Sequence, residues 1–351
     1  MNIPDHRKAI DKIDAQIVRL LNDRTRHVLR IGEIKIKAGE AIYAPHRERV
    51  ILRRICKLNE GPITTESLRA IYREIMSSAL SLEKSMTIAY LGPEATFTHQ
   101  AAVQKFGASL LYSPQKTIAD IFTEVSKGRA DYGVVPVENS TEGVVTHTLD
   151  MFVDSPLQIV AQIVLPIQYC LSGKAPLEQI ERIYVHPQAL GQCRMWLQRT
   201  LPKAEVFETS SNARSAELAG GKSAAITGLL AAEKYGLKII ERDIQDFTEN
   251  ATRFLVLGRQ CGPATGHDRT SLMFSIADAV GALYQALAPF RRYKLNMTKI
   301  ESRPSKRKAW EYFFFVDCDG HMTDPKVAKA IATLSEVCNF VKVLGSYPNG
   351  E

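Results

Sequence analysis

The sequence predicts a multidomain protein with an all-α helical first domain, a two-lobed α/β second domain and a ferredoxin-like α+β third domain. Residues 5–84 show only the spacing of apolar side chains that is typical of helices. From Thr87 onward, short apolar runs alternate with helical segments, which is the pattern of an α/β domain. Residues 271–344 follow the order strand, helix, strand, strand, helix, strand, which is the ferredoxin-like order.

In the first domain we expect three helices of unequal length. Residues 5–37 form the first, which ends at Gly39. The second runs from Arg47 to Leu58, and the third from Glu66 to about Lys84 with Thr65 as its N-cap. The first helix places these apolar side chains at helical spacing: Ile10, Ile13, Ile17, Leu20, Leu21, Val28 and Ile31. Helices of such unequal length make a poor core for one chain, so we expect an intertwined homodimer.

The second domain consists of short strands and helices. The expected strands are Thr87–Leu91, Tyr132–Val137, Arg182–Val185, Ala204–Phe207, Ala224–Ile226 and Arg253–Leu257. The expected helices are Thr96–Phe106, Ile118–Lys127, Ala189–Leu201, Asn212–Ala219 and Leu229–Tyr235. The apolar run Leu157–Leu171 is long enough to cross between two lobes, which predicts a ligand-binding cleft between them.

A linker-like segment, Cys261–Asp268, precedes the third domain. The expected strands of that domain are Ser271–Ile276, Leu295–Ser302, Trp310–Val316 and Phe340–Leu344, and its expected helices are Gly281–Phe290 and Pro325–Val337. This order in so short a stretch gives the ferredoxin-like prediction.

Most of the net charge of +7 lies in the first 86 residues. Acidic side chains are interspersed there, so the pattern favours a small polyanionic substrate over nucleic acid. The six cysteines are scattered without a C-x-x-C pair, which favours a reducing cytoplasm and no metal site. The chain starts in charged helix, unlike a signal peptide, and no run of 18 apolar residues predicts a membrane span.

The spacing of three basic residues on the first helix predicts a shared anion site. At about 100° per residue, Arg24 and Lys35 return to nearly the same face, so together they can bind one small anion. Arg7 points about 100° away and lies roughly 25 Å along the helix. If Arg7 belongs to such a site, it must serve the pocket of another chain. Taken singly, each of these residues is more simply interpreted as part of a solvated, charged helix surface.

Residues 5–84 resemble the helical chorismate mutase domain that bacteria fuse to prephenate dehydratase. The matching motifs are H-R-K-A-I-D at 6–11, N-D-R at 22–24, G-E-I-K at 32–35, R-E at 47–48 and S-S-A-L-S-L-E at 77–83. The resemblance implies rearrangement of chorismate to prephenate. Arg24 would bind one substrate carboxylate, and Arg7 of the partner subunit the other. Arg47 would add positive charge, Glu48 would orient the hydroxyl, and Lys35 would donate to the ether oxygen.

Glu83 would make the second contact to that ether oxygen. Because a carboxylate cannot donate a hydrogen bond, Glu83 would have to be protonated. Burial and the charge of the substrate would raise its pKa. The sequence departs from many relatives at Ala44, where an Asp is common, and this puts part of the substrate or partner orientation in doubt.

Residues 87–258 resemble prephenate dehydratase. The motifs are G-P-E-A-T-F at 92–97, P-V-E-N-S at 136–140, H-P-Q-A-L-G-Q-C at 186–193 and N-A-T-R-F at 250–254. The resemblance implies conversion of prephenate to phenylpyruvate, with Thr252 as the catalytic residue and Arg253 on a substrate carboxylate. Other residues expected to line the cleft are Thr96, Glu138, Asn139, Ser140 and Gln192. Ala95 replaces a usual Gly and Val185 a frequent Ser, which puts substrate fit in doubt.

Residues 269–351 resemble an ACT regulatory domain that senses phenylalanine. The motifs are G-A-L at 281–283, N-M-T-K-I-E-S-R-P at 296–304 and W-E-Y-F-F-F-V-D at 310–317. The resemblance implies an L-phenylalanine site formed by Gly281, Ala282, Leu283, Asn296, Glu301, Ser302, Arg303 and Pro304. The alternative is a dimerisation module that binds no ligand.

Together the resemblances imply domains at 1–86, 87–262 and 268–351, two enzyme activities inhibited by L-phenylalanine, and no cofactor. Two other functions stay open. An arogenate dehydratase would need a contact for the substrate ammonium, and the sequence identifies none. A non-catalytic amino-acid sensor would use the two-lobed domain for binding alone.

Overall fold

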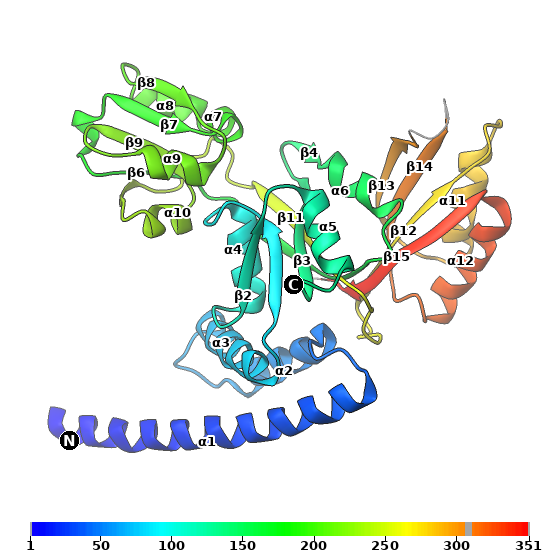
Figure 1. Ribbon diagram of the computed structural model, residues 1–351, viewed down its shortest axis with the longest axis horizontal. Coiled ribbons are helices and arrows are strands. Elements are labelled where there is room, and N and C mark those ends of the chain that lie inside the picture. Colours follow the sequence, from blue (N-terminus) through cyan, green and yellow to red (C-terminus); the bar gives the residue numbers. More distant parts are fainter. Residues whose placement is uncertain (1, 306–310, 350–351) are drawn as a thin grey trace. The chain divides into compact units, whose positions relative to one another are not determined.

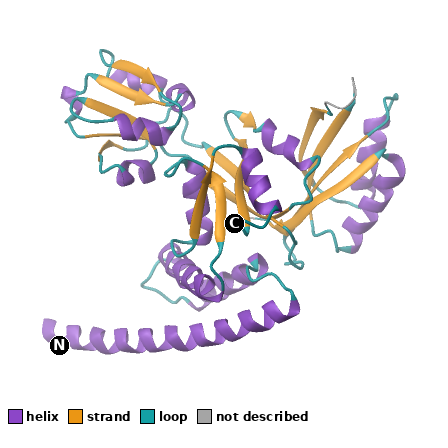
Figure 2. Ribbon diagram, viewed as in Figure 1, coloured by secondary structure: helices purple, strands orange, loops and turns teal. Residues whose placement is uncertain are grey.

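The computed structural model describes residues 2–305 and 311–349, which divide into two compact units (Figure 1). The first unit is Met1–Thr87 with Lys105–Leu111, and the second is Ile88–Gln104 with Tyr112–Glu351. In the described residues 2–86 the regular elements are all helices, whereas the second unit is built on three sheets (Figure 2).

The first unit consists mainly of the three predicted helices, α1 (Ile3–Ala38), α2 (Pro45–Leu58) and α3 (Thr65–Glu83). A capping box between Asn2 and Asp5 starts α1, and Gly39 ends it in the left-handed conformation at φ 68°. The N-cap of α3 is Thr64, whose hydroxyl accepts from the Ser67 amide, so the choice of Thr65 was wrong by one residue.

The N-terminal half of α1 exposes a row of apolar side chains. Ile10, Ile13, Ile17 and Leu20 are 54%, 53%, 47% and 66% exposed. They recur at helical spacing and therefore form one stripe along the helix. Gly32, in the other half, is the one described residue of α1 that is buried.

The first lobe of the second unit contains a six-stranded sheet in the order β2-β1-β3-β11-β5, with β4 paired to β3. Strand β1 runs parallel to β3, and β11 runs antiparallel to β3 and β5. The strands are β1 (Thr87–Leu91), β2 (Leu111–Gln115), β3 (Tyr132–Asn139), β4 (Gly143–Val144), β5 (Gln158–Pro166) and β11 (Ala251–Gly258). The helices are α4 (Phe97–Phe106), α5 (Ile118–Ser126) and α6 (Thr146–Phe152).

The second lobe contains a five-stranded sheet in the order β10-β6-β9-β7-β8. Its strands are β6 (Cys170–Gly173), β7 (Arg182–Val185), β8 (Glu205–Glu208), β9 (Ser223–Thr227) and β10 (Lys238–Glu241). Its helices are η1 (Leu177–Gln179), α7 (Pro187–Gln192), α8 (Arg194–Thr200), α9 (Asn212–Leu218) and α10 (Leu229–Lys234). The run Leu157–Leu171 crosses between the sheets, as predicted, because it supplies β5 and the start of β6. The single helix expected at 189–201 is wrong, since Cys193 leaves helical geometry and separates α7 from α8.

The third sheet is antiparallel, in the order β13-β14-β12-β15, and confirms the ferredoxin-like prediction. Its strands are β12 (Asp268–Ser275), β13 (Met297–Pro304), β14 (Tyr312–Asp319) and β15 (Phe340–Pro348), and its helices are α11 (Ala282–Arg292) and α12 (Pro325–Val337). Trp310, predicted to start a strand, lies outside the described residues.

The third sheet and the first lobe share one apolar core. Buried side chains from both, including Ile159, Leu255, Met273 and Phe315, belong to one contiguous cluster. Strand β15 approaches β5 so closely that a Cβ on Gly345 would clash with the Ile159 backbone. The C-terminal domain is therefore packed as part of the second unit.

Candidate active sites

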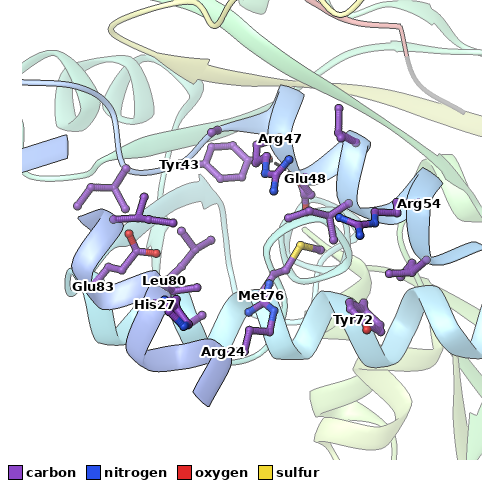
Figure 3. A pocket seen from close by; sticks show the side chains of 18 of the residues that line it. Arg24, His27, Tyr43, Arg47, Glu48, Arg54, Tyr72, Met76, Leu80 and Glu83 are labelled. Atoms are coloured by element: carbon purple, nitrogen blue, oxygen red, sulfur yellow. Dashed lines mark hydrogen bonds between the residues drawn. The ribbon is translucent and has the colours of Figure 1, made fainter. Parts of the chain in front are cut away.

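The first unit contains a pocket of about 590 Å³ lined by α1, α2, α3 and the loop after α1 (Figure 3). Its cationic side chains are Arg24, Lys35, Arg47 and Arg54, and its acidic ones are Glu48 and Glu83. The predicted mutase residues are thus gathered here, apart from Arg7, which does not line the pocket. An excess of positive charge in a partly apolar pocket suits a small anion with an apolar body.

Arg24 and Lys35 reach this pocket from one face of α1, as their spacing requires. The Arg24 Nη1 atom is buried without a hydrogen-bond partner among the described residues. Leaving a buried donor unpaired is costly, and a ligand carboxylate would satisfy it. The Lys35 Nζ atom donates to the carbonyl oxygen of Ile42 at 2.8 Å, which fixes its position and leaves two donors for a ligand.

Glu83 at the end of α3 lies against α1. Burial raises the pKa of this carboxyl group, although the charges of Lys35 and Arg24 act in the opposite direction. It faces Gly32, where an added Cβ would come within 2.8 Å of the Glu83 Oε2 atom. The missing side chain at position 32 therefore makes room for this carboxyl group, a role that the sequence analysis did not identify.

Glu48 is held by two residues that the sequence analysis missed. The Tyr43 hydroxyl donates to Glu48 Oε2 at 3.1 Å, and the Lys105 Nζ atom lies 2.7 Å from the same oxygen. Tyr43 is buried and its ring lies 5.0 Å from that of Phe106. The main-chain amides of Ala108 and Ser109 donate to side chains of α3. Residues 105–109 are thus part of the first unit's structure.

In the second unit, Thr252 on β11 pairs in register with Asn139 on β3. The Asn139 Nδ2 atom donates to the Thr252 hydroxyl at 2.8 Å and to Asn250 Oδ1 at 2.9 Å. Its Oδ1 atom accepts from the amides of Thr141 and Glu142. Because the Thr252 oxygen accepts from Asn139, its own proton is available to donate, and no protein acceptor for it occurs among the described residues.

Gln192 on α7 connects this pair to the second lobe. The Asn250 Nδ2 atom donates to Gln192 Oε1 at 2.5 Å, and Gln192 Nε2 donates to the Thr141 hydroxyl at 3.1 Å. The Ser140 hydroxyl accepts from the Ala251 amide at 3.0 Å. Four predicted residues, Asn139, Ser140, Gln192 and Thr252, therefore gather where the lobes meet.

The Thr96 hydroxyl forms its hydrogen bonds within the loop that carries it. It donates to the carbonyl oxygen of Leu91 at 2.9 Å and accepts from the His99 amide at 3.3 Å. Ala95, which replaces a usual glycine, adopts a left-handed φ of 65°. The first dehydratase motif therefore needs a positive φ at this position, which is why glycine is common there.

Arg253 and Glu138 do not share the face of Thr252, and the prediction that they line the cleft is wrong. Arg253 is 8% exposed and forms ion pairs with Glu138 and with Asp317 of the third sheet. Glu138 also pairs with Lys299 of that sheet. Neighbouring residues of a strand point to opposite faces, so Thr252 and Arg253 cannot both face the cleft.

The predicted phenylalanine residues lie in three segments of the third domain: the start of α11, the residue before β13, and the end of β13. Gly281, at φ 79°, precedes α11, and Ala282 and Leu283 form its first turn. Glu301–Pro304 end β13, the edge strand. The Asn296 Nδ2 atom donates to Asp319 Oδ2 at 3.0 Å.

Across the described residues, no cluster has the composition of a metal site, and all six cysteines are free. No helix in that part of the chain is long and apolar enough to span a membrane.

The chain matches three family models in order: chorismate mutase type II at residues 6–84, prephenate dehydratase at 88–262 and ACT domain at 270–336. The bifunctional chorismate mutase/prephenate dehydratase of Aquifex aeolicus (strain VF5) is 51% identical over 349 residues, covering 97% of this chain and 96% of that protein. The chain belongs to the bifunctional chorismate mutase/prephenate dehydratase family.

Solved structures also resemble the dehydratase and ACT domains of this family member. A prephenate dehydratase from Arthrobacter aurescens in complex with L-Phe is 36% identical with a TM-score of 0.70, covering 75% of this chain and 90% of that one. GqqA, described as a novel type of quorum quenching acylase, is 29% identical with a TM-score of 0.69, covering 75% and 98%. Because one fold carries both descriptions, the chemistry has to be argued from the side chains of the site.

Proposed function

We propose that the pocket of the first unit rearranges chorismate to prephenate and that the Thr252 site converts prephenate to phenylpyruvate. The observation that carries the first step is the unpaired, buried Nη1 atom of Arg24 in a pocket that also contains Lys35 and Glu83. A buried cation that lacks a partner is expected where a substrate anion completes the site.

In the mutase step, the pocket acts by position and charge. Arg24 binds a carboxylate and Arg47 adds positive charge, while Glu48, fixed by Tyr43 and Lys105, orients the substrate hydroxyl. Negative charge grows on the ether oxygen as its bond to carbon breaks. The Lys35 ammonium and the protonated Glu83 carboxyl donate hydrogen bonds to that oxygen.

In the dehydratase step, prephenate loses carbon dioxide and its ring hydroxyl, and the ring becomes aromatic. The electron pair of the carboxylate bond moves into the ring and expels the hydroxyl, which leaves as water after gaining a proton. Thr252, held by Asn139, directs its proton toward that hydroxyl. A hydroxyl is a weak acid, so Thr252 relays a proton and does not supply it alone.

The mutase pocket is proposed to be completed by Arg7 of the partner subunit. The exposed apolar stripe of α1 supports a homodimer, because burying it requires a second surface. Mixed dimers of Arg7→Ala and Arg24→Ala chains would contain one pocket with both wild-type arginines. They are expected to regain mutase turnover that neither variant has, and inactive mixed dimers would refute the shared pocket.

L-phenylalanine is proposed to inhibit through Gly281–Leu283, Asn296 and Glu301–Pro304 of the ACT domain. The Arthrobacter aurescens relative was solved with L-Phe, which supports this ligand class. Inhibition requires the amino acid to bind one arrangement of the protein more tightly than another. A dimerisation domain without a ligand would leave both activities unaffected by L-phenylalanine.

The decisive experiment is a chorismate-to-phenylpyruvate assay on the purified chain, with and without L-phenylalanine. Arg24→Ala is expected to lower mutase turnover on the order of a hundredfold while prephenate turnover persists. Thr252→Ala is expected to do the reverse. Full prephenate turnover in Thr252→Ala would show that the site is misassigned, and no turnover of either substrate by the wild type would favour an amino-acid sensor. Arogenate is the control substrate for the arogenate dehydratase alternative, since no contact for its ammonium is identified.

We also propose domains at 1–86, 87–262 and 268–351 and a cytoplasmic location, in keeping with free cysteines throughout the described chain.

A further inference from the structure

A partly buried row of polar side chains lies between the first lobe and the ACT sheet, next to the Thr252 site along the strands. The lobe contributes Glu138 from β3 and Arg253 from β11, which pair in register. The ACT sheet contributes Lys299 from β13 and Asp317 from β14, which are also register partners. Each of the two strand pairs thus contributes one acidic and one basic side chain, next to the apolar core that the lobe and the ACT sheet share.

Arg253 is almost fully engaged in this row. Its Nη1 atom donates to Glu138 Oε1 at 2.9 Å and to Asp317 Oδ2 at 2.7 Å. Its Nε atom donates to Gln162 at 2.9 Å, and its Nη2 atom donates to the Tyr347 hydroxyl at 2.8 Å. Four of the five N–H donors of this guanidinium are therefore used, two of them by ACT residues.

On the ACT side of the row, Asp317 is held in place by a hydrogen bond from another strand of the ACT sheet. The Ser271 hydroxyl on β12 donates to Asp317 Oδ1 and lies 2.7 Å from the Tyr347 hydroxyl on β15. Asp317 is 6% exposed and Tyr347 is 1% exposed. Each ACT strand thus supplies one member of the row, so a shift of the ACT sheet would move the Asp317 carboxylate relative to Arg253.

The surroundings of Glu138 and Arg253 favour the charged form of each side chain. Burial alone would raise the pKa of Glu138, but the hydrogen bonds and charges of Lys299 and Arg253 outweigh it and lower that pKa. Burial alone would lower the pKa of Arg253, but the electrostatic interactions with Tyr347 and Asp317 and the hydrogen bonds to Glu138 and Asp317 outweigh it and raise that pKa. A buried ion cluster is often no more stabilising than apolar side chains of the same size, so a gain in stability alone does not account for this one.

We propose that Asp317 is a positioning residue for the dehydratase reaction: it holds Arg253 from the ACT side and thereby fixes the neighbouring Thr252–Asn139 pair. This rests on the proposed role of Thr252. The next residues along the same two strands, Thr252 and Asn139, form the 2.8 Å hydrogen bond of the site. Without the Asp317 carboxylate, Arg253 is held less firmly, and the β3 and β11 strands can shift relative to each other and change the Thr252–Asn139 geometry. The dehydratase site therefore depends on the packing of the ACT sheet against the lobe.

The test is Asp317→Asn in the full-length chain, because this change removes the charge but keeps the size of the side chain. We expect prephenate turnover, kcat, to fall about tenfold with KM changed less than about threefold, since small misplacements of a catalytic group act on the chemical step. Chorismate turnover by the same chain is the internal control and is expected to be unchanged, because the mutase pocket belongs to the first unit.

Asp268→Asn is the matched control for stability. Asp268 is a buried ACT carboxylate, 3% exposed, that accepts from the amide and hydroxyl of Thr265; within the described part of the chain its side chain forms no hydrogen bond or ion pair with the row. It is expected to lower Tm while prephenate kcat stays at the wild-type value. An equal loss of kcat in both variants would reduce Asp317 to an ordinary structural residue and overturn the proposal.

Tyr347→Phe keeps the proposal falsifiable if Asp317→Asn folds poorly, and a double-mutant cycle tests the coupling if Asp317→Asn folds. Tyr347→Phe removes one acceptor of Arg253 without changing charge, and kcat is expected to fall about twofold to threefold. In a double-mutant cycle, Arg253→Gln with Asp317→Asn should lose little more kcat than Arg253→Gln alone, because both remove one interaction. Additive losses in the cycle, or wild-type kcat in either Tyr347→Phe or Asp317→Asn, would refute the inference. Failure of the Thr252 assignment is a separate result, seen as full turnover in Thr252→Ala.

Discussion

Gly32→Ala is predicted to weaken the mutase while helping the helix that carries it. The added Cβ would lie 2.8 Å from Glu83 Oε2 and 3.1 Å from its Cγ, whereas ordinary contact begins at 3.4 Å. The carboxyl group must therefore retreat by about 0.6 Å, because it is the end of a flexible side chain and the α1 backbone is not. Since a misplacement of about 1 Å can cost on the order of a hundredfold in rate, we expect mutase kcat to fall roughly tenfold.

The stability of the same variant is expected to move in the opposite direction. Replacing a helical glycine by alanine favours the helix by about 0.8–1 kcal/mol. The measurements are chorismate kcat and KM together with thermal unfolding, with prephenate turnover as the internal control. Gly191→Ala on α7, where an added Cβ meets nothing within 4 Å, is the matched substitution and should leave the mutase unaffected. Wild-type mutase kcat in Gly32→Ala, or a drop in kcat explained by a lower Tm, would refute the reasoning.

Three other predictions concern single side chains. Mutase activity should decline as pH rises through the raised pKa of Glu83, because only the protonated form donates to the ether oxygen; Glu83→Gln should flatten that profile, and an unchanged profile would remove this role. Lys105→Ala should lower mutase kcat/KM about tenfold by freeing Glu48, with Lys105→Arg retaining most activity; equal activity in Lys105→Ala would contradict it. Ala95→Gly should leave Tm unchanged or higher, because removing the strain of the left-handed conformation, about 1–2 kcal/mol, offsets the backbone entropy that glycine loses on folding. Ala102→Gly inside α4 should lower Tm, because no such strain is removed there.

Features that depend on local periodicity could be predicted from the sequence. The placing of Arg24 and Lys35 in one pocket, away from Arg7, follows from the angle per residue of a single helix. The crossing of Leu157–Leu171 between the sheets follows from its length and apolar character. The errors at Thr64 and Cys193 have a local cause as well, because helix ends and interruptions depend on one or two backbone dihedrals that periodicity does not encode.

Contacts between distant segments could not be predicted. Lys105 reaches Glu48 across 57 positions, and no motif connects them. The role of Gly32 depends on α3 packing against α1, which appears only in three dimensions. The error on Arg253 was avoidable, because a strand of period two excludes it from the face that holds Thr252.

The sequence motifs predicted that Arg24 and Arg253 each bind a substrate carboxylate, but the hydrogen bonds of the two arginines differ. Four of the five N–H donors of Arg253 are hydrogen-bonded to protein acceptors. A substrate carboxylate would have to displace these partners, which would leave buried charges unpaired and is therefore unfavourable. Arg24 keeps a buried Nη1 atom without a hydrogen-bond partner in the described chain, and a substrate carboxylate in the pocket would supply one. An unsatisfied donor facing a cavity therefore indicates binding, and a saturated one inside a core indicates positioning. By the same criterion, the Thr252 hydroxyl proton, which has no protein acceptor in the described chain, is available for the reaction. The adjacent Arg253–Asp317 ion pair instead has a positioning role.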